Sequence, residues 1–206
     1  MSGIAGVVNQ NGRPASLDML RRMTDSLAVR GPDALEIWTE GVAGFGHAML
    51  RSTPESVLER QPCTWTSLTI TADARIDNRD ELIRKLNLTG SDARDLVDCG
   101  LILRAYEKWG PDCVHHLLGD FAFAVWDARN RQLFCARDHF GVKPLCYFSG
   151  DDIFVFASEA SGILAVDALE FRLNEARVAD FLVEELEGYD KVSTFYEGIF
   201  KLPPAH

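Results

Sequence analysis

The residues able to do chemistry in this sequence are few, and the first of them is Ser2. It stands directly behind the initiator methionine and is followed at once by the apolar run 3–8, with no polar leader. A hydroxyl placed there raises the question of nucleophilic chemistry. We expect no signal peptide, because the start lacks a basic region and a long apolar core.

A second group that resembles a reactive site is Arg137-Asp138 followed by Gly141 and Lys143. Lys143 resembles a phosphate-binding lysine, yet no glycine-rich phosphate loop precedes it. We therefore expect Arg137 and Asp138 to form a structural ion pair. Gly141 would permit a tight turn between them and Lys143.

Metal and disulfide chemistry are not favoured. His115-His116 would bind a metal only if a carboxylate or a cysteine joined the pair in space, and we expect a turn or a helix end there instead. The five cysteines are odd in number, contain no CxxC and match no zinc spacing, which predicts reduced, mostly buried thiols. They are Cys63, Cys99, Cys113, Cys135 and Cys146.

Composition narrows the class of protein. The chain has 206 residues, 47% of them hydrophobic, which is enough for a sizeable core. A formal charge of −10 and a pI near 4.9 argue against nucleic acid or an anionic membrane as a partner. The apolar runs are much shorter than a membrane span. We therefore expect a cytoplasmic protein, and the oligomeric state stays open.

The elements that must position these residues follow from periodicity and turn residues. Helices are predicted over 17–29, from 78, from 91 toward 109, and over 173–186. Their predicted caps are Ser16, Asp77 or Asn78, Ser91 and Asn174. Strands are predicted over 3–9, 35–40, 43–50, 66–73, 120–127, 132–138, 145–149 and 153–159.

The strand 120–127 carries the clearest pattern. Phe121, Phe123 and Val125 fall on one face, while alanines and Trp126 fall on the other. Such a strand can be buried on both faces, as happens between layers. Together with hairpin-like spacing, this predicts a layered α+β fold with antiparallel sheets.

Several motifs occur in an order that resembles the N-terminal class II glutamine amidotransferase domain of asparagine synthetases. The motifs are Gly3-Ile4, Arg30-Gly31-Pro32-Asp33, Gly46-His47, Gln61-Pro62, GDFAFAVWD at 119–127, RDHFGVKPL at 137–145 and Ala157-Ser158-Glu159. The resemblance implies a four-layer αββα N-terminal-nucleophile (Ntn) hydrolase fold. It assigns residues 1–165 to the amidotransferase-like domain and 166–206 to a helix and linker leading to a synthetase domain.

The resemblance also gives Ser2 a meaning. In that family the residue after the methionine is a cysteine nucleophile, and methionine removal frees an α-amine with a pKa of about 7.7–8.0 that can act as its general base. Serine is a weaker nucleophile near neutral pH. Ser2 is therefore read as a vestigial nucleophile position.

Further positions of the implied glutamine pocket are altered. The arginine that clamps the glutamine carboxylate corresponds to Met49, although Arg51 would point to the same face if the strand continued. The Asn-Gly pair of the oxyanion hole corresponds to Asp73-Ala74. The aspartate that receives the substrate amine is kept as Asp98, but the acid two residues later is Gly100.

Three functions remain open. The favoured one is a catalytically degenerate domain of an ATP-dependent amide ligase that does not use glutamine, of the lasso-peptide macrocyclase or β-lactam synthetase kind. The stretch 51–56 (RSTPES) is more similar to the peptide cyclases. The alternatives are an active N-terminal serine amidohydrolase and the glutaminase domain of a glutamine-dependent asparagine synthetase.

Cofactors and partners follow from the same resemblance. The synthetases' pyrophosphate loop, Ser-Gly-Gly-x-Asp-Ser, does not occur in these 206 residues. We therefore expect no cofactor in this chain, with ATP and Mg²⁺ belonging to the missing synthetase domain. The expected partners are that C-terminal synthetase domain and a precursor peptide.

Overall fold

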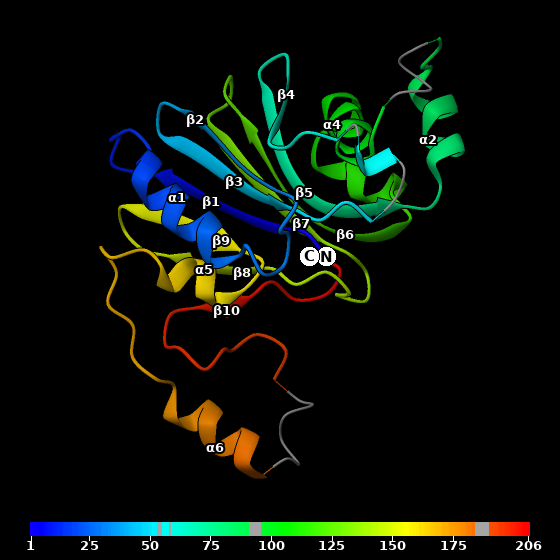
Figure 1. Cartoon of the computed structure of the whole chain (residues 1–206). Helices are drawn as coiled ribbons and strands as arrows, with labels where there is room; N and C mark the ends of the chain where they lie inside the picture. The colour runs from blue at the N-terminus through cyan, green and yellow to red at the C-terminus, as the bar shows by residue number, and fades with distance from the viewer. Residues whose placement is uncertain (53–54, 58, 91–95, 184–189) are drawn as a thin grey trace.

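A computed structural model of the chain describes residues 1–52, 55–57, 59–90, 96–183 and 190–206. Their strands form two antiparallel sheets that lie face to face (Figure 1). The six-stranded sheet has the order β10-β8-β9-β1-β3-β2 and the four-stranded sheet has the order β4-β5-β6-β7. The strands are β1 (Gly3–Asn9), β2 (Ala34–Glu40), β3 (Ala43–Met49), β4 (Cys63–Trp65), β5 (Leu68–Ile76), β6 (Gly119–Asp127), β7 (Gln132–Arg137), β8 (Cys146–Ser149), β9 (Ile153–Ala157) and β10 (Phe200–Lys201).

Helices cover the outer face of each sheet, which confirms the predicted four-layer α+β architecture. Helices α1 (Leu17–Ser26) and α5 (Ala160–Leu164) pack on the six-stranded sheet. Helices α2 (Arg79–Leu86) and α4 (Asp98–Trp109) pack on the four-stranded sheet, and the 3-10 segment η2 (Gly110–His116) follows α4. None of the described helices is both long and apolar enough to cross a bilayer.

Strand β6 is buried on both faces, as its alternation predicts. Phe121, Phe123 and Val125 pack toward α4, while Ala122, Ala124 and Trp126 face the six-stranded sheet. There they meet Ile4, Phe45 and Phe156. The small alanines of β6 let the two sheets approach closely, and the aromatic residues of the other sheet fill the remaining space.

Close packing on β1 also requires a glycine. A Cβ atom added to Gly6 would lie 2.4 Å from the ring of Phe156, far inside van der Waals contact. Strand β1 lies between β3 and β9 in the middle of its sheet. This placement holds the segment that begins at Ser2 in a fixed position.

The helix caps show where local prediction succeeds. The Ser16 hydroxyl accepts a hydrogen bond from the amide of Met19 at 3.3 Å, and Asn174 accepts one from the amide of Arg177 at 3.1 Å. Asn78 is at the predicted cap position, but its side-chain oxygen accepts from the amide of Leu118 instead. The predicted cap Ser91 lies outside the described residues.

Several helix and strand boundaries differ from those predicted, and three short elements were not predicted. Helix α1 ends at Ser26, not near 29, and β3 ends at Met49. Strands β4 and β10 have three and two residues, too short to show alternation, and both depend on a partner strand. Helix α5, of five residues, was also not predicted.

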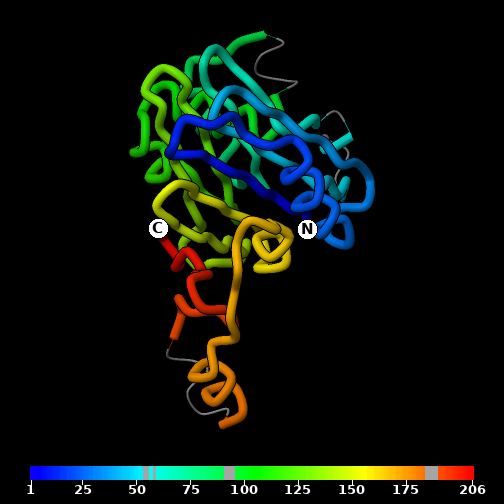
Figure 2. The backbone as a smooth tube through the Cα atoms, turned by 90° about the vertical axis from the view of Figure 1, so that its left-hand side faces the viewer, coloured from blue at the N-terminus to red at the C-terminus, as the bar shows by residue number. Residues whose placement is uncertain are grey.

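The C-terminal segment is partly extended and partly built into the fold. Helix α6 (Glu175–Val183) lies away from both sheets in both views (Figures 1 and 2). Beyond it, β10 pairs with β8, and Ile199 is buried in the core under α1. The backbone carbonyl of His206 accepts a hydrogen bond from the amide of Arg137 at 2.7 Å. The residues expected to form a linker therefore contribute to the six-stranded sheet.

Candidate functional site

A cavity of about 470 Å³ opens where the start of β1, the end of β3 and the end of β5 meet. Four of the six predicted site residues line it, namely Ser2, Asp73, Ala74 and Asp98. Its other lining residues are Met1, Leu50, Ser52, Ser56, Glu59, Gln61, Ala72, Arg75, Ile76, Asp77, Arg79, Val97 and Lys143. The fold thus brings together predicted site residues that lie up to 96 positions apart in the sequence, from Ser2 to Asp98.

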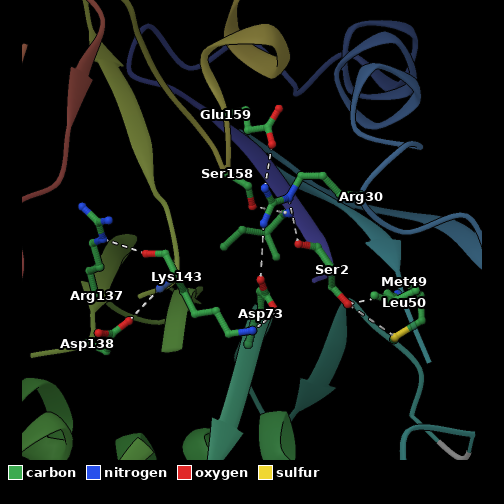
Figure 3. Close-up of polar contacts among 12 residues, drawn as sticks. Ser2, Arg30, Met49, Leu50, Asp73, Arg137, Asp138, Lys143, Ser158 and Glu159 are labelled. Carbon is green, nitrogen blue, oxygen red and sulfur yellow. Dashed lines mark hydrogen bonds and ion pairs between the residues drawn. The ribbon is translucent and has the colours of Figure 1, made fainter. Parts of the chain in front are cut away.

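Ser2 is held by three contacts (Figure 3). Its hydroxyl oxygen accepts a hydrogen bond from the amide of Leu50 at 3.0 Å and lies 4.0 Å from the sulfur of Met49. Its backbone carbonyl accepts a hydrogen bond from Nε of Arg30 at 3.1 Å. Ser2 is only 9% exposed, so its hydroxyl is fixed at the cavity wall.

Asp73 carries a buried negative charge beside Ser2. Its Oδ1 accepts from Nζ of Lys143 at 3.0 Å, and its Oδ2 lies 3.6 Å from Nη2 of Arg30. The side chains are only 7%, 12% and 12% exposed in the order Asp73, Lys143 and Arg30. Arg30 also pairs with Glu159 at 2.6 Å. We call Arg30, Asp73, Lys143 and Glu159 the Asp73 charge cluster (Figure 3), and its formal charges cancel.

The loop that presents Lys143 is organised by Asp138. The carboxylate of Asp138 accepts hydrogen bonds from the amides of Phe140, Val142 and Lys143 at 2.9–3.1 Å. Gly141 has a φ of 65°, which a glycine adopts without steric cost. Asp138 is 1% exposed, so the loop backbone is fixed from inside the protein.

The predicted ion pair between Arg137 and Asp138 is wrong. The guanidinium of Arg137 donates to the carbonyls of Gly141, Lys143 and Leu202, each at 2.6 Å. Arg137 ends β7 and Asp138 follows it directly. Each side chain binds backbone groups instead of the other side chain. Burial lowers the pKa of Arg137, while the nearby Asp138 charge acts in the opposite direction.

The charge of Asp98 is also balanced by a side chain of this protein. One carboxylate oxygen forms an ion pair with Arg79, and the other accepts from the amide of Ile76 at 3.1 Å. Arg79 donates further to the carbonyl of Leu96 at 2.5 Å. The carboxylate that would receive a substrate amine therefore already has a cationic partner in the chain.

Gln61 and Glu59 complete one wall of the cavity. The Gln61 amide pairs with both backbone groups of Ala72, at 2.6 and 2.8 Å, as a neighbouring strand would. Burial raises the pKa of Glu59, and hydrogen bonds to Cys99 and Gln61 oppose that shift. Gln61 is thus a structural anchor for the residue that precedes Asp73.

Two predicted site residues lie elsewhere. Met49 approaches Ser2 but does not line the cavity. Arg51, the predicted substitute for the clamp arginine, lies beyond the end of β3, so the strand alternation does not reach it. Its Nη1 donates to the carbonyl of Asp33 at 3.2 Å, and its amide donates to the Asp33 carboxylate at 2.7 Å. Asp33 therefore orders the start of this loop.

His47 belongs to the interior between the sheets. It is 1% exposed, and its Nδ1 lies 3.1 Å from the hydroxyl of Thr71. Burial lowers the pKa of His47 to about 3, so the ring is neutral at physiological pH. His115-His116 forms the end of η2, as predicted, and the His116 ring contacts that of Trp109 with centroids 4.0 Å apart and planes tilted by 33°. Over the described ranges, no cluster of three His, Cys, Asp or Glu side chains could hold a metal ion.

Sequence reasoning missed the partners of Asp73. Arg30 and Glu159 entered the sequence analysis only within motifs, and Lys143 only as a resemblance to a phosphate-binding lysine. No local signal shows that Arg30 and Lys143 meet at the Asp73 carboxylate, or that Glu159 pairs with Arg30. They come from the segment after α1, the loop after β7 and the end of β9. The available signal was the charged residue that each of these motifs carries: Arg30 before Gly31, Lys143 after Gly141, and Glu159 after Ser158.

Comparison with known proteins agrees with this architecture. The family model of a glutamine amidotransferase domain matches residues 1–206. Asparagine synthetase [glutamine-hydrolyzing] 3 of Bacillus subtilis is 35% identical over all of this chain and 34% of its own length. A putative asparagine synthetase [glutamine-hydrolyzing] 2 of Methanocaldococcus jannaschii is 30% identical over 98% of this chain and 42% of its own. The chain thus spans about a third to two fifths of these relatives.

Solved structures support the fold. Glutamine phosphoribosylpyrophosphate amidotransferase from B. subtilis, complexed with ADP and GMP, aligns with a TM-score of 0.65 and 18% identity. The alignment covers 80% of this chain and 43% of that one. At this identity the likeness concerns the Ntn-hydrolase fold alone. With the family match over its whole length, this chain belongs to the glutamine amidotransferase domain family.

Proposed function

We propose that this chain is a glutaminase-like domain that has lost glutamine hydrolysis and serves an asparagine-synthetase-like, ATP-dependent amide ligase. The relatives are longer proteins of which this domain is one part. The ligase would take an amine already present in its substrate. Release of ammonia from glutamine would then be unnecessary.

The observation that carries this proposal is the Asp73 charge cluster beside Ser2. An amide hydrolase needs hydrogen-bond donors aimed at the oxyanion that develops during attack. Here the corresponding position holds a carboxylate, which accepts hydrogen bonds, and Lys143 and Arg30 are already engaged with it. Loss of one oxyanion donor costs about 2.7–4 kcal/mol of barrier, and a negative charge in its place costs more.

The other anchors support the same conclusion. Asp98 is paired with Arg79, so a substrate ammonium would have to compete with an internal cation. Met49 offers no charge for a substrate carboxylate, and Arg51 is bound to Asp33. The groups that would recognise glutamine are thus either replaced or satisfied within the chain.

Among such ligases we favour a lasso-peptide macrocyclase. The support is the stretch 51–56, of which Thr53 and Pro54 lie outside the described residues. In such an enzyme the synthetase domain would use ATP and Mg²⁺ to adenylate a peptide carboxylate, releasing pyrophosphate. A peptide amine would then displace AMP and form the amide bond. The domain described here would support that unit and help to shape its peptide-binding surface.

The first test is glutamate release from glutamine by the purified protein, after mass spectrometry has established the state of Met1. We expect no release from the unmodified sequence and none from Ser2→Cys. The combination Ser2→Cys, Met49→Arg, Asp73→Asn and Ala74→Gly restores the nucleophile, the carboxylate clamp and the oxyanion pair, leaves Gly100 unchanged, and serves as the comparator. Turnover by the unmodified chain would end the proposal, and turnover by Ser2→Cys alone would contradict the argument from Met49 and Asp73.

The second test concerns the ligase. Incubated with ATP and its precursor peptide but without glutamine, the full-length protein should release pyrophosphate and convert the peptide to a product lighter by one water. Amide formation that requires glutamine would instead indicate an ordinary asparagine synthetase.

One observation favours an active amidohydrolase as the alternative. The hydroxyl of Ser2 faces the cavity and accepts from the Leu50 amide, which fixes its position. Once Met1 is removed, the freed amine could act as its base. Retention of Met1 in the mature protein would exclude this mechanism, because the amine would be blocked by a peptide bond.

A cytoplasmic location is part of the proposal. It rests on the free state of the five cysteines, which is typical of reducing compartments.

A further inference from the structure

A second cavity, of about 340 Å³, opens between the two sheets at the end of the sandwich that lies away from Ser2. Strand β1 starts at the candidate site and runs seven residues toward this cavity, so the two cavities are about 20 Å apart. We call this second cavity the distal groove. Apart from Gln10 at its edge, it is lined by Val8, Trp126, Arg131, Leu133, Cys135 and Phe154.

The walls of the distal groove are apolar and come from both sheets. Val8 of β1 and Phe154 of β9 are paired neighbours in the six-stranded sheet. Trp126 of β6 and Leu133 of β7 are paired neighbours in the four-stranded sheet. All four belong to, or pack against, the core cluster between the sheets. The apolar part of a ligand in this groove would therefore extend that core and leave water.

Trp126 offers a hydrogen-bond donor that no described residue engages. The residue is only 4% exposed, and within the described ranges no oxygen accepts from its indole N–H. The nitrogen is also not one of the fully buried unpaired atoms found there, so it borders accessible space. Because an indole nitrogen donates and does not accept, a ligand beside it must present an acceptor.

The turn between β6 and β7 places a cation at the same groove. The Asp127 carboxylate accepts hydrogen bonds from the amides of Arg129 and Asn130 at 2.9 and 3.3 Å, which fixes the turn. Arg131 follows with a φ of 51°, a left-handed conformation that a residue with a side chain adopts only at a cost. Its exposed side chain takes part in no ion pair with a described residue.

The charge of the lining is one-sided. Among the described residues, Arg131 is the one charged side chain that lines the distal groove. Asp152 lies close by, because its carbonyl accepts from the amide of Gln10 at 2.7 Å, but it does not line the groove. A guanidinium pairs best with a carboxylate, which binds it through two parallel hydrogen bonds.

We propose that the distal groove binds a small apolar carboxylate. The apolar body would lie between the sheets against Val8, Phe154 and Leu133. The carboxylate would accept hydrogen bonds from Arg131 and from the indole N–H of Trp126. This inference goes beyond the proposed ligase function and does not depend on it, because the groove shares no lining residue with the cavity at Ser2.

The probe is octanoate, added to the purified, ¹⁵N-labelled chain and followed by two-dimensional nuclear magnetic resonance. The four tryptophans give four indole N–H signals, and Trp126→Phe assigns the one that belongs to Trp126. We expect octanoate to shift that signal saturably, with a Kd of about 1 mM or below, and to leave the other three in place. The unmodified protein alone suffices for this measurement.

Two further probes test the chemistry of the ligand. Octylammonium has the same apolar chain and the opposite charge, and acetate has the same charge without the chain. Both should bind at least about tenfold more weakly than octanoate, because one meets Arg131 with a like charge and the other buries no apolar surface.

Arg131→Gln tests the cation, and Arg129→Gln is its matched control. Arg129 belongs to the same turn but does not line the distal groove. Loss of a charge-assisted hydrogen bond should weaken octanoate binding by at least about tenfold in Arg131→Gln, while Arg129→Gln should bind as the parent protein does. Both positions are exposed, and the unchanged indole signals of the other tryptophans verify that each variant is folded.

Four results would overturn the proposal. They are no saturable shift up to about 10 mM octanoate, equal shifts of all four indole signals, equal binding of octanoate and octylammonium, and equal losses in the two arginine variants. The first would show an empty groove, the second general surfactant binding, and the last two an apolar contact without recognition of the carboxylate.

Discussion

Lys143→Met tests whether the buried ion pair with Asp73 holds the cavity wall together. Methionine keeps most of the apolar stem of the lysine and removes only the ammonium group. In the parent protein this group lies 3.0 Å from the Asp73 carboxylate, and the two side chains are 12% and 7% exposed. The substitution therefore leaves a buried carboxylate with one remaining cationic neighbour.

The expected loss follows from that geometry. Removal of one partner from a buried ion pair costs about 3–5 kcal/mol, because the other charge stays buried. Arg30 remains 3.6 Å from Asp73, so we expect the lower end, about 3 kcal/mol. For a chain of this size that loss corresponds to a melting temperature lower by roughly 6–12 °C.

Urea denaturation of the parent and the variant measures the difference, and Lys85→Met is the matched control. Lys85 pairs with Glu81 at 2.7 Å on an exposed helix surface, with side chains 44% and 47% exposed. Such pairs contribute about 0.3–0.5 kcal/mol, so Lys85→Met should change the free energy of unfolding by no more than that. The double variant Lys143→Met/Asp73→Leu removes both charges and should be more stable than Lys143→Met alone.

Two results would refute this reasoning. If Lys143→Met loses no more stability than Lys85→Met, the Asp73 contact contributes nothing in solution. If the double variant is less stable than Lys143→Met by the full cost of a second independent substitution, the two charges are not coupled.

Two further predictions concern buried groups outside this pair. The pKa of His47, about 3 in the folded protein, lies below its unfolded value near 6.5, so the unfolded state binds more protons and stability falls as the pH drops below 6.5. His47→Gln should flatten the slope between pH 6 and 4 by about 1.4 kcal/mol per unit, measured by urea titrations, and an unchanged slope would mean that the ring titrates normally. Asp138→Ala leaves three amide donors of the Lys143 loop without their acceptor and should cost at least about 3 kcal/mol, with Asp138→Asn losing less because one oxygen remains. Equal losses for the two Asp138 variants would show that the charge, not the hydrogen-bond geometry, determines stability.

Local features of the fold were accessible from the sequence. The alternation of β6 gave both of its buried faces, and the caps Ser16 and Asn174 marked helix starts, because these signals act between near neighbours. Short elements were not accessible, since β4 and β10 have too few residues for a period and form only against a partner strand.

Pairings of charged side chains were the least predictable part. Adjacent Arg137 and Asp138 suggested an ion pair, yet each side chain binds the backbone of the following loop instead. Arg51 was a candidate for the missing clamp, but the strand ends two residues earlier and the side chain turns to Asp33.

The sequence by itself determined the layered fold and the family, and it predicted the positions at which a glutaminase site would be altered. Those conclusions rest on residue types, order and spacing, which the chain carries whether or not it is folded. Only the tertiary structure decided that the aspartate at position 73 is held by Lys143 and Arg30, and that Asp98 is held by Arg79. These contacts join segments from different layers, and no local rule specifies which distant charge reaches a buried carboxylate. The packing of the two sheets makes that selection, because a charge buried there without a partner would be too costly to keep.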